Sequence, residues 1–263
     1  MTDSKTVLPD MDEIMRAQIP TIKRWPQQCK NAVTKALTAT LRQCYSAATE
    51  EAQIRAWKLK FMFAKCVCRM QPQIRGGRKK KLKRNESLRT ALLARVTRWT
   101  DGEYSELWAE ACAAYGSAKG RPPPESSLEA NIKRAKLSAQ DARYGKAVAA
   151  LLSLGTAEIT RETVREMKAK HPEAPPPLVP PPFNEQLPRY EEDLVREKIE
   201  SFPAGSAAGA SGLRPQFLQD MLACPNKQVG KDALKTLRLL ANHLAAGKAE
   251  NWHPTSQEHL LWH

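Results

Sequence analysis

The residues best suited to do chemistry in this sequence form a dense run of cations. Between Lys65 and Arg98 there are twelve Lys or Arg residues and a single acid, Glu86. Cationic side chains neutralise phosphates and release their counterions, and arginine also donates two parallel hydrogen bonds. Gly76 and Gly77 let the backbone itself approach a phosphate closely. The candidate nucleic-acid-binding residues are therefore Arg75, Arg78, Lys79, Lys80, Lys81, Lys83, Arg84 and Arg89.

Two other interpretations of this cationic run remain open. Residues 78–84, Arg-Lys-Lys-Lys-Leu-Lys-Arg, fit the pattern of a nuclear import signal and could serve that purpose alone. The run could also be a solvated surface without a ligand. No residue in it indicates recognition of base edges. We therefore expect RNA or DNA as the partner, bound non-specifically through its phosphates, and a nuclear location.

A metal site is not expected. Cys66 and Cys68 could begin a zinc site, but zinc typically takes four ligands in two close pairs, and no second pair follows. The five histidines all lie at position 171 or beyond, and the last three are loosely spaced near the chain end. We expect Cys66 and Cys68 to be buried helical thiols.

A catalytic site is not expected either. The small-residue loop 205–212 lacks the Lys-Ser/Thr of a phosphate-binding P-loop and the Gly-x-Ser-x-Gly of a nucleophile elbow. Acid pairs such as Glu103/Glu106 and Glu191/Glu192 lie at predicted helix starts, where carboxylates offset the helix dipole. Trp57, Trp99 and Trp108 lie on apolar faces and are expected in the core.

The overall composition fits a basic binding protein inside the cell. The 263 residues carry 42 Lys or Arg against 28 Asp or Glu, a net charge of +14 that a polyanionic partner would relieve. Nucleic acid is the first such partner and an acidic membrane surface the second. We expect no membrane span, because no run of about 18 apolar residues occurs. The start has no secretory pattern, so the six cysteines are expected to be reduced in an intracellular protein.

The elements that position these residues are predicted to be helices, and the fold class mainly α. Residues 1–26 are expected to be an irregular N-terminal segment. Residues 27–171 form a basic helical region, in which apolar residues recur every three or four positions over 27–48, 54–68 and 88–99. Thr100 and Glu103 predict a capping box that opens the next helix.

A stiff spacer divides the predicted helical regions. Residues 172–188 contain eight prolines, which favour an extended polyproline conformation. The segment is interpreted as a Pro-rich linker, and an SH3-type protein partner for it stays open. Residues 189–248 then predict short helices, with Pro215 as the first residue of one and Gly247 as the terminator of the last. Residues 249–263 form a divergent tail.

One turn in this last region is distinctive. Within the segment 195–222, a loop of small residues is followed by a proline that begins a helix. This pattern resembles the lead-in to the reverse-transcriptase domain of non-LTR retroelement polyproteins, where a Gly-Pro-Ser/Asp-Gly-Leu/Ile turn precedes a Pro-started helix. Ala210 stands where that family usually has proline. The matching residues are Gly209, Ser211, Gly212, Leu213, Arg214 and Pro215.

Other segments are similar to the same family. The helix at 229–247 resembles the family's next element. Upstream, Trp25-Pro26 with Cys29, the Arg-Gly-Gly-Arg-Lys run at 75–79 and Leu107-Trp108 resemble its pre-polymerase segment. The resemblance implies short helices that lead into the fingers region of a right-hand polymerase.

The resemblance also implies what this chain lacks. The family is an RNA-directed DNA polymerase whose palm aspartates, including an adjacent Asp-Asp pair, bind two metals. The sequence contains no Asp-Asp pair, and residues 249–263 depart from the family's continuation. Two-metal chemistry requires those ligands, so Mg²⁺ would belong to a missing palm and we expect no catalytic residue or cofactor here. In the intact parent, Arg214 would lie near template or nucleotide.

The favoured interpretation is therefore a truncated retroelement polyprotein that retains non-specific nucleic-acid binding. From the resemblance we expect helices of residues 189–263 to expose apolar faces meant for a missing domain. The first alternative is a host basic helical nucleic-acid-binding or adaptor protein without enzymatic activity. A second is a scaffold in which residues 54–69 form a basic amphipathic helix for a calmodulin-like partner or an acidic membrane.

Overall fold

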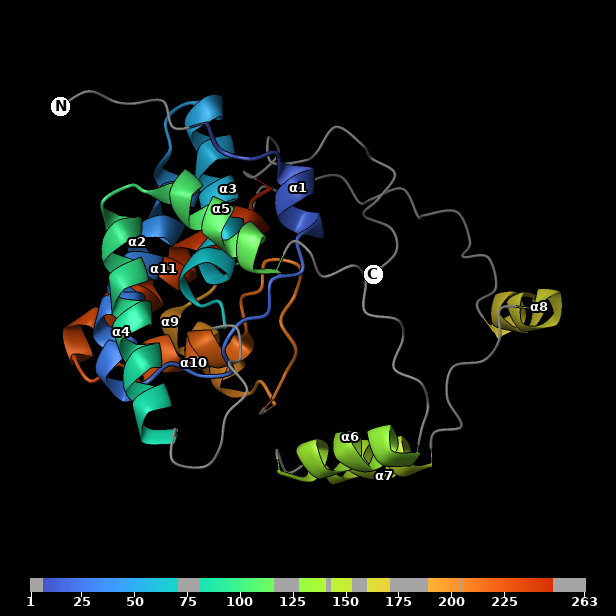
Figure 1. The fold of residues 1–263 in the computed structure, drawn as a ribbon. Coiled ribbons are helices and arrows are strands. Elements are labelled where there is room, and N and C mark those ends of the chain that lie inside the picture. Colours follow the sequence, from blue (N-terminus) through green and yellow to red (C-terminus); the bar gives the residue numbers. More distant parts are fainter. Residues whose placement is uncertain are drawn as a thin grey trace. The chain divides into compact units, whose positions relative to one another are not determined.

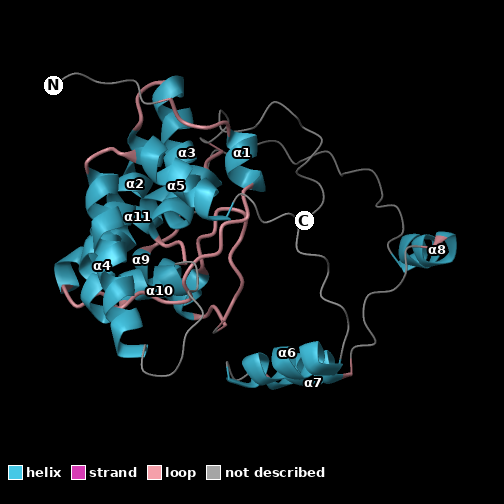
Figure 2. Cartoon of the chain, in the orientation of Figure 1, coloured by secondary structure: helices cyan, strands magenta, loops and turns pink. Residues whose placement is uncertain are grey.

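The computed structural model describes residues 7–70, 81–115, 128–140, 143–152, 160–170, 189–203 and 205–247. These residues form eleven α-helices and one short 3-10 helix, with no β-strand among them (Figure 2), so the predicted mainly-α class is confirmed. The chain divides into two compact units. Unit 1 comprises residues 1–119 and 188–263, and unit 2 comprises residues 120–187. The predicted Pro-rich linker and divergent tail lie outside the described residues.

Unit 1 is built from helices of both chain ends (Figure 1). They are α1 Met11–Arg16, α2 Lys30–Ser46, α3 Glu50–Val67, α4 Lys81–Thr100, α5 Tyr104–Tyr115, α9 Glu192–Glu200, α10 Pro215–Leu222 and α11 Lys227–Ala245, with a 3-10 turn at Gln27–Cys29 before α2. Helix α2 packs against α3, α4, α10 and α11, and is therefore the element that joins the two ends.

The apolar periodicity predicted over residues 27–68 is a helix pair, α2 and α3. The Thr49 hydroxyl accepts a hydrogen bond from the Ala52 N–H at 3.2 Å, which caps the start of α3 and separates it from α2. From Ala56 to Val67, α3 is buried along most of its length. This burial contradicts the alternative in which residues 54–69 form a free amphipathic helix.

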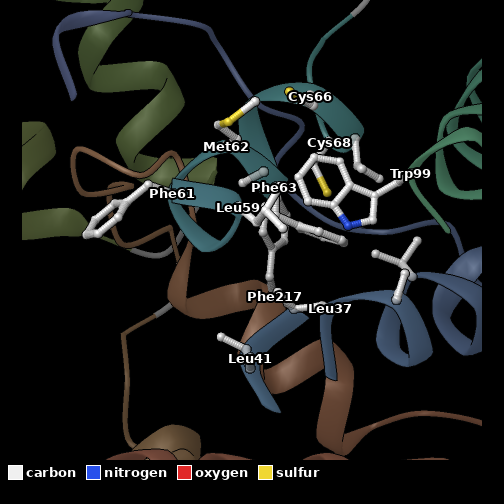
Figure 3. Close-up of a cluster of buried hydrophobic side chains, with 14 of the residues drawn as sticks. Leu37, Leu41, Leu59, Phe61, Met62, Phe63, Cys66, Cys68, Trp99 and Phe217 are labelled. Atoms are coloured by element: carbon white, nitrogen blue, oxygen red, sulfur yellow. The ribbon is translucent and has the colours of Figure 1, made fainter. Parts of the chain in front are cut away.

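Apolar side chains from all eight α-helices of unit 1 and from the segment before α2 meet in one core. Phe63 of α3 meets the edge of Trp99 of α4 with ring centroids 5.2 Å apart, as Figure 3 shows. Trp25 stacks on Phe217 of α10, also at 5.2 Å. Aromatic pairs in these arrangements contribute about 0.5–1.5 kcal/mol beyond their burial. The predicted core tryptophans are confirmed as buried: Trp57, Trp99 and Trp108.

The N-terminal segment differs from the irregular stretch expected for residues 1–26. It contains α1, whose Ile14 is fully buried against the core. Helix α1 has only six residues, too few to be stable alone, so its packing on α3 holds it in place. Lys65 of α3 donates a hydrogen bond to the Ile14 carbonyl, which satisfies an acceptor near the end of α1.

The C-terminal helices α10 and α11 bury apolar residues in the core of unit 1. This differs from the expectation that helices of residues 189–263 expose apolar faces meant for a missing domain. Within the described residues, Phe217 and Met221 of α10 are fully buried in the same core as the N-terminal helices. Asp220 forms a buried ion pair with Lys30 at 2.9 Å and accepts a hydrogen bond from the backbone N–H of Trp25 at 3.0 Å. Removing one partner of such a pair typically costs about 3–5 kcal/mol.

The capping box predicted at residues 100–103 is wrong. Thr100 is the last residue of α4, and its hydroxyl donates to the Thr97 carbonyl at 2.7 Å instead of capping α5. Glu103 accepts a hydrogen bond from Arg98 at 2.6 Å. The helix that follows does bury Leu107 as expected, because the apolar spacing, and not the cap, determines its face.

Unit 2 contains three described helices, α6 Leu128–Gln140, α7 Tyr144–Leu151 and α8 Arg161–Lys170. Helices α6 and α7 pack together. Their buried apolar residues are only Ala135 and Ala147, so the two backbones meet through small side chains. The larger apolar residues of this pair are exposed: Leu128, Ile132, Leu137, Tyr144, Val148, Leu151 and Leu152.

Candidate nucleic-acid interface

The cationic run begins from a fixed point in unit 1. Just before it, the backbone pairs with the N-terminal segment: the Ile22 N–H donates to the Cys68 carbonyl at 2.9 Å, and the Met70 N–H donates to the Pro20 carbonyl at 2.8 Å. The Tyr115 hydroxyl donates to the Met70 carbonyl. Three contacts within three residues therefore hold the chain where it enters the run.

Two buried arginines reinforce this point. Arg95 donates to the Arg69 carbonyl at 2.9 Å, at the C-terminal end of α3, where a cation also complements the helix dipole. Arg69 donates to the Leu107 carbonyl at 3.2 Å and pairs with Glu110 at 2.8 Å. Burial alone would raise the pKa of Glu110, but hydrogen bonds from Arg98 and Arg69 hold that pKa below its usual value.

The fold thus uses four of the twelve cations between positions 65 and 98. Lys65, Arg69 and Arg95 are buried and hydrogen-bonded, and Arg98 pairs with Glu103 and Glu110. The eight cations that remain are the eight candidate binding residues predicted from the sequence. The structure therefore assigns a packing or pairing role to these four cations, and among the eight candidates it describes the side chain of Arg89, which is exposed.

The candidates differ in how far the structure places them. Residues 75–80, with Arg75, Arg78, Lys79 and Lys80, lie outside the described residues. The backbone at positions 81–84 forms the first turn of α4, which includes Lys81, Lys83 and Arg84 and has no acid. Arg89 is exposed one turn further along α4, and its carbonyl accepts from the Cys29 thiol at 3.9 Å.

The turn that carries the resemblance packs against the start of the chain. Gly212 is buried with φ of 71°, a conformation that glycine adopts without strain. Its carbonyl accepts a hydrogen bond from the Thr21 hydroxyl at 3.1 Å. A Cβ at this position would lie 3.2 Å from Thr21 Cγ2 and 3.3 Å from Lys65 Cγ. The small residue is thus required by close packing inside unit 1.

The other residues of this turn have local roles. The Gly212 N–H donates to the Gly209 carbonyl at 2.9 Å, and the Leu213 N–H donates to the Ser211 hydroxyl at 3.2 Å. Leu213 packs against the core. Pro215 is the first residue of α10, as predicted, and Arg214 is its N-cap residue. Arg214 is partly buried, and its Nε atom has no hydrogen-bond partner within the described structure.

The thiols are buried and unreactive in character, as expected for Cys66 and Cys68. Burial raises the pKa of each of these two thiols to about 12, so neither is a thiolate at neutral pH. Within the described ranges, no three His, Cys, Asp or Glu residues are grouped in a way that could hold a metal ion.

Sequence reasoning missed a second set of surface cations, on α2 and α11. Lys227, Lys231 and Lys235 are exposed along one edge of α11, four residues apart. Lys35 and Arg42 are exposed on α2, which contains no acid. The helical spacing of the lysines was visible in the sequence, but the contact between α2 and α11 was not, because nearly two hundred residues separate them.

The comparisons with known proteins add no family. No protein-family model, no curated protein and no solved structure matches the chain. Among the described helices, none combines the length and apolar character needed to cross a membrane.

Proposed function

We propose that this chain binds RNA or DNA non-specifically through the cationic run 75–84 and the start of α4, and that it acts in the nucleus. The observation that carries the proposal is the division of cations in this region. Four are buried or ion-paired within unit 1, whereas the other eight follow one another in a stretch of sequence that contains a single acid, Glu86. Like charges held so close in sequence repel each other, and a polyanion relieves that repulsion.

The geometry of α4 supports the same ligand. Its first turn contains cations and no acid, which is the reverse of what the helix dipole favours. An anion at a helix N-terminus is stabilised by the free N–H groups and here also by the neighbouring cations. A phosphate backbone meets both requirements and needs no base-specific contact.

The binding is tested by fluorescence anisotropy of labelled single-stranded RNA and duplex DNA over a range of salt concentrations. Five phosphate contacts predict a slope of log K against log salt of about −4.5 for duplex DNA and about −3.5 for a single strand. Replacing Arg78, Lys79, Lys80 and Lys81 with Ala should flatten the slope by roughly 3 to 4, and equally for unrelated sequences.

A control variant replaces Lys133, Lys146, Arg161 and Lys168 with Ala. These four residues are exposed on helices of unit 2, and their replacement removes the same charge as the replacement of Arg78, Lys79, Lys80 and Lys81. The salt slope should therefore change little if the cationic run is the binding site. Equal loss in both variants would indicate attraction by net charge alone. No anisotropy change with either nucleic acid would sink the proposal.

We further propose that the chain derives from a non-LTR retroelement polyprotein, on the strength of the turn at residues 209–215. The alternative, a host basic helical nucleic-acid-binding or adaptor protein, accounts for the cations equally well but does not account for the likeness of that turn to the family. The genomic locus separates them. Translation beyond the codon for His263 in all three frames should reveal a polymerase palm with paired aspartates. Its absence from every copy would leave the host protein as the better explanation.

A further inference from the structure

Helices α2 and α11 border a cleft whose lining includes no residue of the cationic run. The two helices pack side by side. Asn31 near the start of α2 accepts a hydrogen bond at 3.2 Å from the backbone N–H of Asn226, the N-cap residue of α11. Arg42 and Lys235, further along each helix, line the same cavity, so the two helices run in the same direction. Further along, the helices border a cavity of about 400 Å³. Its lining residues are Arg42, Tyr45, Asp232, Lys235, Thr236 and Leu239.

The lining combines two cations with an apolar wall. Arg42 of α2 and Lys235 of α11 are both exposed at the cleft. The guanidinium group can donate two parallel hydrogen bonds to one phosphate, and the ammonium group adds a point charge. Tyr45 and Leu239 are partly buried and offer an apolar surface, on which a sugar or base can pack.

Two further lysines of α11 precede the lysine that lines the cleft. Lys227, Lys231 and Lys235 follow one edge of α11 at intervals of about 6 Å along the helix axis. Like charges at i, i+4 spacing repel each other, and a bound polyanion would relieve that repulsion. The only acid of α2 and α11 together is Asp232, whose carboxylate accepts from the Gln228 side chain at 2.9 Å.

We infer that this cleft binds the phosphate backbone of a nucleic-acid strand and is a second contact site beside the cationic run. The inference rests on the proposed nucleic-acid binding and adds a place on the folded surface. A linear array of cations that ends in a cleft with an apolar wall fits a strand of repeated phosphates and sugars. Asp232 repels the same backbone and limits the affinity of the site.

The first test uses the full chain with Arg42→Gln and Lys235→Gln, and labelled single-stranded RNA. Loss of two phosphate contacts should flatten the salt slope by about 1.4 and weaken binding roughly tenfold at 0.1 M salt. Because both side chains are exposed, thermal unfolding should stay unchanged. The matched control, Arg161→Gln with Lys168→Gln, removes the same two residue types from exposed positions on α8 and should keep the wild-type slope.

A variant expected to strengthen binding tests the same cleft in the opposite direction. Asp232→Asn keeps the size of the side chain and removes the repulsive charge, so binding should tighten by up to about fivefold at 0.1 M salt. A wild-type salt slope in the Arg42/Lys235 variant, or weaker RNA binding by Asp232→Asn, would overturn the inference that the cleft binds the phosphate backbone. The cationic run would then still stand if its own variant lost binding. If the wild-type chain binds neither RNA nor DNA, the proposed function fails and the cleft fails with it.

Competition identifies the source of the phosphate. Inorganic phosphate at constant ionic strength should displace the RNA poorly, because a single ion engages only part of the array. Displacement of RNA by free phosphate at low millimolar concentration would overturn a backbone site in favour of a small-anion site.

Discussion

Unit 1 and unit 2 are both helical, yet they bury different kinds of side chain. Unit 1 gathers buried apolar residues from its eight described α-helices in the core that contains Trp25, Phe63 and Phe217. The α6–α7 pair of unit 2 buries Ala135 and Ala147 and leaves its leucines exposed. Burying a Leu or Phe side chain contributes about 1.5–3 kcal/mol, whereas an alanine contributes far less. Helix content therefore says little about where the stability of this chain lies.

The two units also differ in the contacts that their buried polar groups make. Unit 1 satisfies buried cations with carbonyls and carboxylates that come from distant segments, as in the Lys30–Asp220 pair. Among the described residues of unit 2, the buried polar side chain is that of Asn131, and one of its contacts is a hydrogen bond accepted from Arg134 one turn away. Long-range contacts of the first kind make unfolding cooperative, whereas a local contact can open by itself.

A pair of leucine substitutions tests the comparison with the largest expected effect. Leu37→Ala removes a fully buried side chain of α2 and should lower the free energy of unfolding by about 2–5 kcal/mol. Leu152 directly follows α7 and is 74% exposed, so Leu152→Ala should change the free energy of unfolding by less than about 0.5 kcal/mol. Urea unfolding followed by far-UV circular dichroism gives both values. Equal costs would show that unit 2 buries its leucines after all.

A pH series sharpens the account of buried cations in unit 1. Lys65 is 2% exposed, and burial lowers the pKa of its ammonium group from 10.5 to about 8. Between pH 8 and 10.5 the unfolded chain holds this proton and the folded chain does not, so Lys65 makes stability rise with pH there. Relative to Lys65→Met, the wild-type protein should gain about 3 kcal/mol across that window, measured by urea unfolding.

The difference between the two proteins is the informative quantity. The thiols of Cys66 and Cys68, with pKa values raised to about 12, oppose this trend, because they deprotonate in the unfolded chain first and lower stability above about pH 9. Both proteins share these thiols, so their effect cancels in the comparison. A stability difference that stays constant from pH 7 to 10.5 would mean that Lys65 titrates normally.

Local sequence pattern predicted much of the fold in unit 1. The spacing of apolar residues located α2, α3 and α4, and Pro215 and Gly247 marked a helix start and a helix end correctly. These features depend on neighbours within about four positions along the chain. The six-residue helix α1 was missed because its stability comes from packing of Ile14 and not from its own propensity.

The candidate site was predictable only in part for the same physical reason. Residue type identified the cationic run, but type alone could not show that Lys65, Arg69 and Arg95 are buried and already bonded. The cleft between α2 and α11 depends on a contact between helices about 190 residues apart. No local pattern encodes such a contact, so Arg42 and Lys235 could not be brought together from sequence.

The smallest predicted effect concerns the turn on which the resemblance rests. Gly212→Ala places a Cβ in a left-handed conformation and in close contact with Thr21 and Lys65, and should cost about 1–2 kcal/mol. Gly209→Ala is the matched control, because Gly209 has no positive φ and nothing lies within 4 Å of its added Cβ. That control should be neutral or stabilise by up to about 1 kcal/mol. Urea unfolding followed by tryptophan fluorescence separates the two, and equal costs would mean that the turn does not dock on the start of the chain. A cost at Gly212 alone would give this residue a packing role within unit 1, whatever the origin of the chain.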